Sequence, residues 1–229
     1  MNAWLSFSLI LLGIWLAIWI VKPSLRKEMM RVSLLTAPFG LTEPLFVPEY
    51  WNPPSLFNLA AKSGFDIESL IFSFAIGGIG AVLYETFAKV EHTKMSHREM
   101  ASPKHRFHVL ALLSPVIAFI PLYFLTPLNP IYSASIAMAI GGIAVMLCRP
   151  DLISKIVLGS LLFLGLYFVF FLTFNLVYPG TVEQVWNLEA VSGILIVGVP
   201  LEELMFALTF GALWASYYEH IGRYKLKGA

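Results

Sequence analysis

Long apolar stretches constrain this chain more than any other feature of its sequence. They lie at residues 3–21, 31–47, 65–88, 107–126, 131–148, 153–178 and 200–222. About 20 apolar residues in a helix are enough to cross the hydrocarbon core of a bilayer. Charged residues make up only 13% of the chain, against about 25% in soluble domains. The sequence therefore predicts an all-α integral membrane protein with seven transmembrane helices.

The basic residues predict how these helices are oriented. All but one of the 15 Lys and Arg residues lie close after the first, third, fifth or seventh stretch, and Lys62 is the exception. Basic residues favour cytoplasmic loops. The N-terminus is therefore expected outside the cell and the C-terminus in the cytoplasm, in a prokaryotic cell membrane. The first stretch lacks the basic start and cleavage site of a signal peptide, so it is expected to be a retained helix.

Two of the apolar stretches are similar in sequence. Residues 65–87 align without a gap with residues 199–221. The identical pairs are Glu68/Glu202, Leu70/Leu204, Phe72/Phe206, Gly77/Gly211, Ala81/Ala215, Tyr84/Tyr218 and Glu85/Glu219. An internal repeat is therefore expected, with one of these helices in each copy.

Shorter similarities extend the repeat to both halves of the chain. The matches are Trp51-Asn52 with Trp186-Asn187, Glu43-Pro44-Leu45-Phe46 with Asn175-Leu176-Val177-Tyr178, and Lys22-Pro23-Ser24-Leu25 with Arg149-Pro150-Asp151-Leu152. Two three-helix units joined directly would be inverted, and the fourth stretch restores their common orientation. The prediction is two parallel three-helix repeats, residues 1–89 and 128–229, joined by a basic cytoplasmic loop and one linker helix at residues 90–127.

The repeated glutamates are the first candidates for function. An ionisable residue inside a membrane span is a functional-site hypothesis by default. Because Glu68 and Glu202 occupy equivalent positions, they are expected to face each other across the pseudo-twofold axis, with Phe72 and Phe206 one turn further on. Two carboxyl groups in one apolar slot cannot both ionise easily, so one would donate a proton and the other accept one.

Other glutamates at the helix ends have a simpler explanation. Acidic residues near helix N-termini are favoured by the helix dipole, and this reading stays open for Glu203 and Glu49. Glu85 and Glu219 lie 17 residues beyond Glu68 and Glu202 in the sequence, which is about 25 Å along a helix. They are expected to be interface anchors at the cytoplasmic end.

The residues Pro200-Leu201-Glu202-Glu203-Leu204-Met205-Phe206 resemble the Pro-Leu-Glu-Glu-x-x-Phe motif of the small membrane lycopene cyclases. The resemblance also takes in Trp51-Asn52-Pro53, Trp186-Asn187 and the acidic residue Glu43. The fused members of this family similarly have two three-helix units joined by an extra span. The first unit departs from the pattern, since it reads Asp66-Ile67-Glu68-Ser69 where Pro and a second Glu are more usual. Asn175 stands where an acidic residue is usual.

This resemblance implies a non-redox lycopene β-cyclase reaction, in which an acid protonates the terminal double bond of a linear carotenoid and a base removes a proton after ring closure. It implies Glu202 and Glu68 as the acid/base pair, with Glu43 and Glu203 as supporting carboxylates. The residues implied at the substrate are Phe72, Phe206, Trp51, Trp186 and Asn175. Aromatic faces stabilise a nearby cation by about 0.5–2 kcal/mol.

Three alternatives stay open: a cyclase of another membrane isoprenoid, a carotenoid- or isoprenoid-binding protein without catalysis, and a small transporter. A retinal protein would need a lysine in residues 200–222, which contain none. An intramembrane metalloprotease would need Arg where Ala207 stands. Expected partners are the bilayer and a lipophilic polyene or isoprenoid, and either a homo-oligomer or a complex with other carotenoid enzymes stays open.

The sequence gives no reason to expect a cofactor, a metal or nucleic acid. No dinucleotide-binding fingerprint is present, and Gly77-Gly78-Ile79-Gly80 lies inside an apolar stretch, where close helix packing explains it. Four of the five histidines, His92, His97, His105 and His108, lie in the basic loop or at its edge. A solvated loop is the expected explanation for them.

Overall fold

The computed structural model describes residues 2–227, apart from the side chain of Lys104, and 76% of it is helical. Five helical segments are long and apolar enough to cross a membrane. They are α1 (Ala3–Val21), α4 (Ile67–Phe87), α6 (His108–Leu125), α7 (Pro130–Cys148) and the segment Pro150–Val177, which comprises η5 (Pro150–Leu152) and α8 (Ile153–Val177). The predicted mostly helical class is confirmed, and the five candidate spans support a membrane protein.

The other two predicted stretches are interrupted helices. The stretch at 31–47 is built from α2 (Arg26–Thr36), which starts earlier than expected, and the 3-10 helix η2 (Ala37–Leu45). Pro38 and Pro44 lie in η2 and have no N–H to continue an α-helical ladder. The stretch at 200–222 divides into α10 (Leu201–Trp214) and α11 (Tyr217–Gly222).

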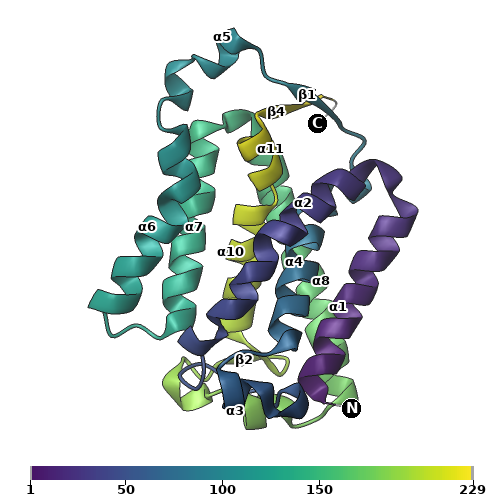
Figure 1. Ribbon diagram of the computed structural model, residues 1–229, viewed down its shortest axis with the longest axis vertical. Coiled ribbons are helices and arrows are strands. Elements are labelled where there is room, and N and C mark those ends of the chain that lie inside the picture. The colour runs from purple at the N-terminus through teal and green to yellow at the C-terminus, as the bar shows by residue number, and fades with distance from the viewer. Residues whose placement is uncertain (1, 228–229) are drawn as a thin grey trace.

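The helices form a bundle in which α4 and α10 lie at the centre (Figure 1). α4 packs against α1 and α2, and α10 packs in the same way against α7 and α8. α4 also packs against α8, which joins the two halves. α6 packs on the outer face of α7, and few of its side chains are buried. Most of α6 therefore presents apolar side chains to the surroundings.

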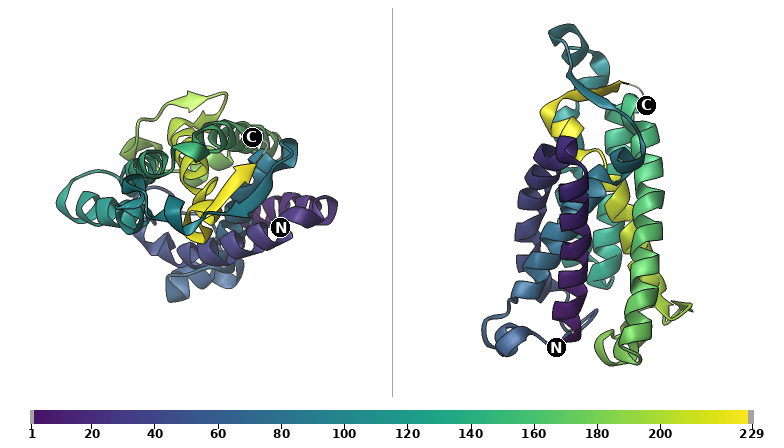
Figure 2. Two further views of the ribbon diagram at one scale, coloured as in Figure 1. Left: turned by 90° about the horizontal axis from the view of Figure 1, so that it is seen from above. Right: turned by 90° about the vertical axis from the view of Figure 1, so that its right-hand side faces the viewer.

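The two ends of the bundle are closed differently. The N end, where the N-terminus lies in Figure 1, carries the hairpin of β2 (Leu195–Ile196) and β3 (Val199–Pro200). The C end, where the C-terminus lies, carries an antiparallel ladder of β1 (Glu91–Lys94) and β4 (Tyr224–Lys227), seen from above in Figure 2. The remaining short elements are η1 (Pro23–Leu25), η3 (Leu56–Asn58), α3 (Leu59–Ser63), α5 (His97–Met100), η4 (Pro103–His105), α9 (Thr181–Val185) and η6 (Leu188–Ala190).

A reciprocal contact joins the two halves at the N end. Trp51 and Trp186 form an isolated antiparallel bridge. The Asn52 N–H donates to the Val185 carbonyl at 2.8 Å, and the Asn187 N–H donates to the Tyr50 carbonyl at 2.9 Å. The Trp-Asn segments that match in sequence thus bind each other directly.

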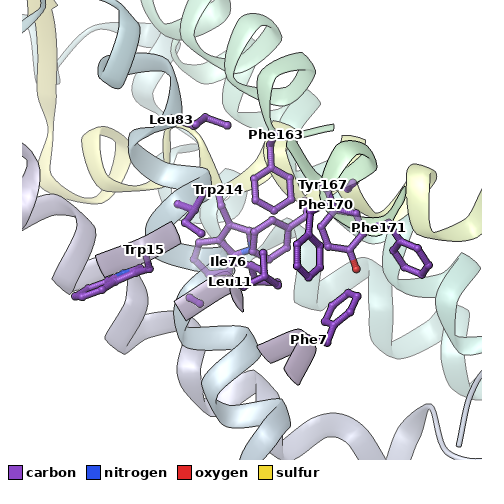
Figure 3. Close-up of a cluster of buried hydrophobic side chains, with 14 of the residues drawn as sticks. Phe7, Leu11, Trp15, Ile76, Leu83, Phe163, Tyr167, Phe170, Phe171 and Trp214 are labelled. Carbon is purple, nitrogen blue, oxygen red and sulfur yellow. The ribbon is translucent and has the colours of Figure 1, made fainter. Parts of the chain in front are cut away.

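Aromatic side chains fill the interior between these ends. Figure 3 shows Phe7 of α1 beside Tyr167, Phe170 and Phe171 of α8, with Trp214 of α10 close by. Phe7 meets Phe170 edge to face, with ring centroids 4.5 Å apart. The core is therefore continuous across the two halves, and the candidate site opens within it.

Candidate active site

A cavity of about 370 Å³ lies within the aromatic core. Its volume is in the range of small-molecule sites. Its wall is formed by side chains from α1, η2, α4, α6, α7, α8 and α10. Among the described residues, Glu43 and Glu203 are the acidic side chains that line it, and no His or Cys does so. Any acid–base chemistry in the cavity therefore depends on these two carboxyl groups.

Glu203 is held by three hydrogen-bond donors. It lies in the first turn of α10 and is buried. Its Oε1 accepts from the Tyr50 hydroxyl at 2.6 Å and from Trp186 Nε1 at 2.8 Å, and its Oε2 accepts from the Tyr167 hydroxyl at 2.7 Å. Hydrogen bonds to a charged acceptor are stronger than neutral ones. These donors therefore stabilise a carboxylate that has no basic partner among the described side chains.

Glu43 lies in η2, and a second carboxyl group, that of Asp66, lies close to it. Glu43 Oε2 accepts from the Ser69 hydroxyl. Asp66, the N-cap of α4, has its carboxyl group beside the Glu43 side chain. Glu43 Oε1 and Asp66 Oδ2 are buried and have no donor elsewhere in the described part of the chain. Two carboxyl groups can hydrogen bond to each other only if one of them carries a proton.

The expected placement of Glu68 and Glu202 in a shared slot is wrong. Neither side chain lines the cavity. Glu68 Oε1 accepts from the Leu56 N–H at 2.7 Å and from Asn2 Nδ2 at 3.2 Å. Glu202 Oε1 accepts from the Ser192 N–H at 3.0 Å and from the Tyr132 hydroxyl at 2.6 Å. Each glutamate thus holds the loop that precedes its own helix.

The aromatic residues expected at the substrate are Phe72, Phe206, Trp51 and Trp186, and all four line the cavity. Asn175 does not, which corrects its expected place at the substrate. Its Nδ2 donates to the Gly198 carbonyl at 2.8 Å. Gly198 has a φ of 80°, a conformation that favours glycine, so Asn175 fastens a tight turn before α10.

Several residues of the site were not expected from the sequence. Tyr50, Ser69 and Tyr167 line the cavity and bind its carboxyl groups, and Asp66 lies behind Glu43. One signal was present in the alignment of the two halves, because Ser69 stands opposite Glu203. The halves therefore differ at this cavity-lining position, although Phe72 and Phe206 are identical and also line the cavity.

The cavity reaches the outer apolar surface beside α6. Phe39 of η2 and Val116 of α6 both line it, and each is 50% exposed. Pro115 and Phe119 of α6 continue the same wall. An apolar molecule dissolved in the bilayer could therefore reach the carboxyl groups from the side, without passing through water.

Comparison with protein families finds one match. Residues 129–221 fit the family model described as lycopene cyclase. This segment of the chain is therefore similar to the lycopene cyclase family. No curated protein and no solved structure matches the chain.

The lycopene cyclase match covers one side of the cavity. It contains Glu203 together with Tyr167 and Trp186, which bind its carboxylate. Glu43 and Asp66 come from the half of the chain that precedes the match. The family match therefore supports a carotenoid cyclase type of function, and the structure adds the second acidic group to the site.

Proposed function

We propose that this chain is a lycopene β-cyclase-type enzyme that converts the end group of a linear carotenoid into a six-membered ring. The observation that carries the proposal is the pair of carboxyl groups, Glu43 and Glu203, in the wall of one aromatic cavity that reaches the apolar surface. A polyene has no polar group to bind, so its recognition depends on shape and apolar contact. The carboxyl groups then act on its double bonds.

Glu43 is the proposed acid. The Asp66 carboxyl group lies beside Glu43, and two carboxyl groups that share one site cannot both ionise easily, so the pair can hold one proton and supply it to the terminal double bond. Protonation leaves a tertiary carbocation, and the adjacent double bond attacks it to form the ring. The Asp66 carboxyl group stays behind Glu43 and accepts a hydrogen bond from the Ser69 N–H at 2.5 Å, which fixes its position.

Glu203 is the proposed base. Its three donors hold it as a carboxylate, ready to take the proton that the ring loses when the new double bond forms. One proton enters the substrate and one leaves, so the reaction is an isomerisation without an oxidant or reductant. Phe72, Phe206, Trp51 and Trp186 line the cavity and stabilise the cation between these steps.

The proposed architecture is two parallel three-helix repeats with seven crossings, the N-terminus outside and the C-terminus cytoplasmic. The first repeat covers residues 1–89 and the second 128–229, with residues 90–127 as linker. Two observations support it. The packing of α1 and α2 on α4 has the same pattern as the packing of α7 and α8 on α10. The reciprocal hydrogen bonds of Asn52 and Asn187 relate equivalent residues.

Expression in lycopene-accumulating cells tests the reaction. The wild-type chain is expected to yield cyclised pigment, and Glu43→Gln and Glu203→Gln are each expected to lower its formation at least about 100-fold, the loss typical of a missing acid or base. Glu49→Gln is the matched control, because Glu49 is exposed. Unchanged lycopene bound to well-expressed, folded wild-type protein would favour a binding protein without catalysis. Wild-type turnover in Glu203→Gln would exclude the proposed base.

A further inference from the structure

Three side chains that can bind a metal meet at the C end of the bundle. They are His108, the first residue of α6, Cys148, the last residue of α7, and His220 of α11. One ligand atom from each lies within 4.8 Å of the other two. The His108 and His220 rings meet edge to face, with centroids 4.3 Å apart. None of the three lines the candidate active site.

The ring nitrogens of His220 are buried without a partner among the residues that the structure describes. Its side chain is fully buried, with 0% of the residue exposed. Within residues 2–227, neither of its ring nitrogens has a hydrogen-bond partner. A buried polar group without a partner destabilises the fold, and native structures satisfy almost all of them. A metal ion bound by one ring nitrogen of His220 would remove most of this destabilisation.

A fourth donor lies next to the cluster. His105 of η4 has its Nδ1 3.7 Å from Cys148 Sγ. His105 and His108 also border a small cavity of about 30 Å³, which is large enough for one water molecule or ion. Imidazole nitrogen and thiolate sulfur are ligand types that Zn²⁺ takes in tetrahedral sites. The same donors bind the hard cations Mg²⁺ and Ca²⁺ poorly.

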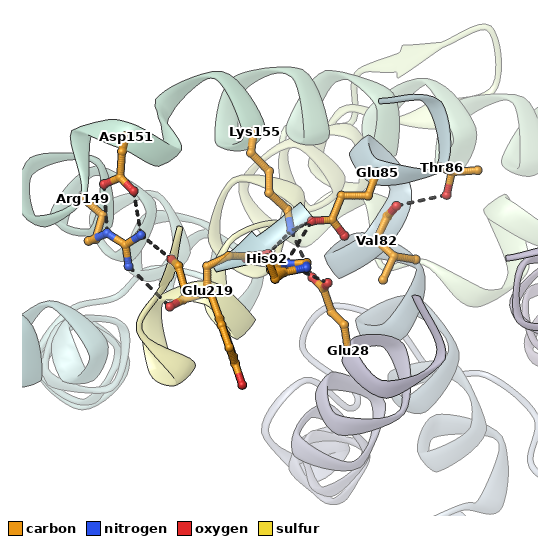
Figure 4. A network of polar contacts seen from close by, with 10 residues as sticks. Glu28, Val82, Glu85, Thr86, His92, Arg149, Asp151, Lys155 and Glu219 are labelled. Carbon is orange, nitrogen blue, oxygen red and sulfur yellow. Dashed lines mark hydrogen bonds and ion pairs between the residues drawn. The ribbon is translucent and has the colours of Figure 1, made fainter. Parts of the chain in front are cut away.

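Arg149 and Arg223 border the small cavity beside His105 and His108. Arg223 is exposed to solvent, and Arg149 is paired with a carboxylate. Arg149 is buried beside Cys148, and its guanidinium binds Asp151 through Nε–Oδ1 at 2.9 Å and Nη2–Oδ2 at 2.6 Å (Figure 4). It also donates to the backbone carbonyls of Glu219 and Tyr224. The ion pair with Asp151 therefore limits the repulsion that Arg149 would exert on a bound cation.

A second cluster of side chains at the same end also has residue types that bind metals, but its carboxylates already bind a lysine. Glu28, Glu85, His92 and Glu219 also place ligand atoms within 4.8 Å of one another. Lys155 Nζ lies between the three carboxylates, at 3.0, 2.9 and 2.7 Å (Figure 4). An internal cation thus takes the place that a metal would need. At the other cluster, no described Lys or Arg side chain hydrogen bonds to a ring nitrogen of His220.

We propose that His105, His108, Cys148 and His220 bind one Zn²⁺ ion. Cys148 loses its proton on binding and coordinates as the thiolate, and the histidines coordinate as neutral imidazoles. The ion ties together the start of α6, the end of α7 and the C-terminal α11, which lie far apart in the sequence. Its role is structural, so the proposal does not depend on the proposed cyclisation.

Cobalt provides a spectroscopic test on the full chain in detergent. After chelator treatment, the wild-type protein is expected to bind one Co²⁺ per chain with the visible bands of tetrahedral cobalt and a thiolate-to-cobalt charge-transfer band. Zn²⁺ should displace it. Cys148 is the single cysteine of the chain, so Cys148→Ser should abolish the charge-transfer band. His220→Gln and His105→Gln should each weaken Zn²⁺ binding at least about tenfold, as disturbed metal sites do.

His97→Gln is the control, because His97 is an exposed histidine of the same loop. It should bind both metals as the wild type does. Failure of the wild type to bind Co²⁺ stoichiometrically would overturn the proposal, as would an unchanged spectrum in Cys148→Ser. Unchanged Zn²⁺ affinity in His105→Gln would remove His105 from the site. If His220→Gln does not fold, the Cys148→Ser spectrum still decides the outcome.

Discussion

Two adjacent glutamates, Glu202 and Glu203, have different partners because successive residues on a helix point about 100° apart. Glu202 turns toward the preceding loop, where it accepts from the Ser192 N–H. Glu203 turns into the cavity and accepts from Tyr167. The motif in the sequence predicts that carboxyl groups matter here, but it does not indicate which of the two reaches the interior.

A pair of tyrosine variants distinguishes the two environments. Tyr167→Phe removes a donor from Glu203, and Tyr132→Phe removes one from Glu202. Each is expected to lower the free energy of unfolding by about 1.5–3 kcal/mol, the range for hydrogen bonds to charged groups. Only Tyr167→Phe should also slow cyclisation in the pigment assay, since only Tyr167 lines the cavity. Equal loss of turnover in both variants would contradict the assignment of Glu203 to the site.

At the scale of the element, the long helices were predictable and the interrupted ones were not. α1, α4, α6, α7 and α8 follow from uninterrupted apolar runs. The path of η2 does not, because it depends on how closely it packs against α4. A Cβ on Gly40 would lie 2.6 Å from backbone atoms of Ser69 and Leu70. This contact, which has no periodic pattern in the sequence, places Glu43 beside Ser69.

Gly40→Ala tests the importance of that packing. The added methyl group should push η2 away from α4 and lower the free energy of unfolding by about 1–3 kcal/mol, as overpacking does. It should also reduce cyclisation, because Glu43 moves with η2. Thermal unfolding in detergent and the pigment assay measure the two effects.

Gly13→Ala of α1 is the control for this substitution. A Cβ on Gly13 would meet nothing within 4 Å, and alanine favours a helix over glycine by about 0.5–1 kcal/mol. This variant should therefore be at least as stable as the wild type. A wild-type melting temperature and turnover in Gly40→Ala would contradict the close approach of η2 and α4.

At the scale of the whole molecule, the similarity between the two halves did not indicate which carboxyl groups line the cavity. Identical residues such as Glu68 and Glu202 serve a role that both halves share, which is to hold a loop. The carboxyl groups of the cavity stand at positions where the halves differ, with Glu203 opposite Ser69 and Glu43 opposite Asn175, whereas the identical Phe72 and Phe206 both line its wall. Identity between the halves therefore indicated part of the aromatic wall and the glutamates that hold loops, and the carboxyl groups of the candidate site required the three-dimensional contacts.

The C end contains a titratable contact between the halves. His92 of β1 lies over a buried group of charged residues, and its Nε2 is 2.6 Å from Glu219 Oε1, 3.3 Å from Glu85 Oε1 and 3.4 Å from Glu28 Oε2. The Tyr218 and Tyr224 rings pack against it edge to face. Burial lowers the pKa of His92, but hydrogen bonds to Glu219 and Glu85 outweigh this effect and raise it to about 9.

This raised pKa predicts a pH-dependent stability. The His92 pKa is about 6.5 in the unfolded chain and higher in the folded one, so the stabilisation is complete below about pH 6.5 and is lost as the pH rises through about 9. His92→Gln should therefore melt at a lower temperature than the wild type in acidic buffer, with the difference shrinking in alkaline buffer. His97→Gln is the control. A difference that does not change with pH would argue against a charged His92.

The buried lysine at this end has a further consequence for assembly. Glu28 and Lys155 each stand three residues after the matching leucines Leu25 and Leu152, so in the proposed repeat they are counterparts of opposite sign. Two copies of the first half would bring four carboxylates together with no lysine between them. The opposite charges of Glu28 and Lys155 therefore disfavour the pairing of two identical halves and favour the pairing of the first half with the second. The same preference would hold if the two halves were made as separate chains.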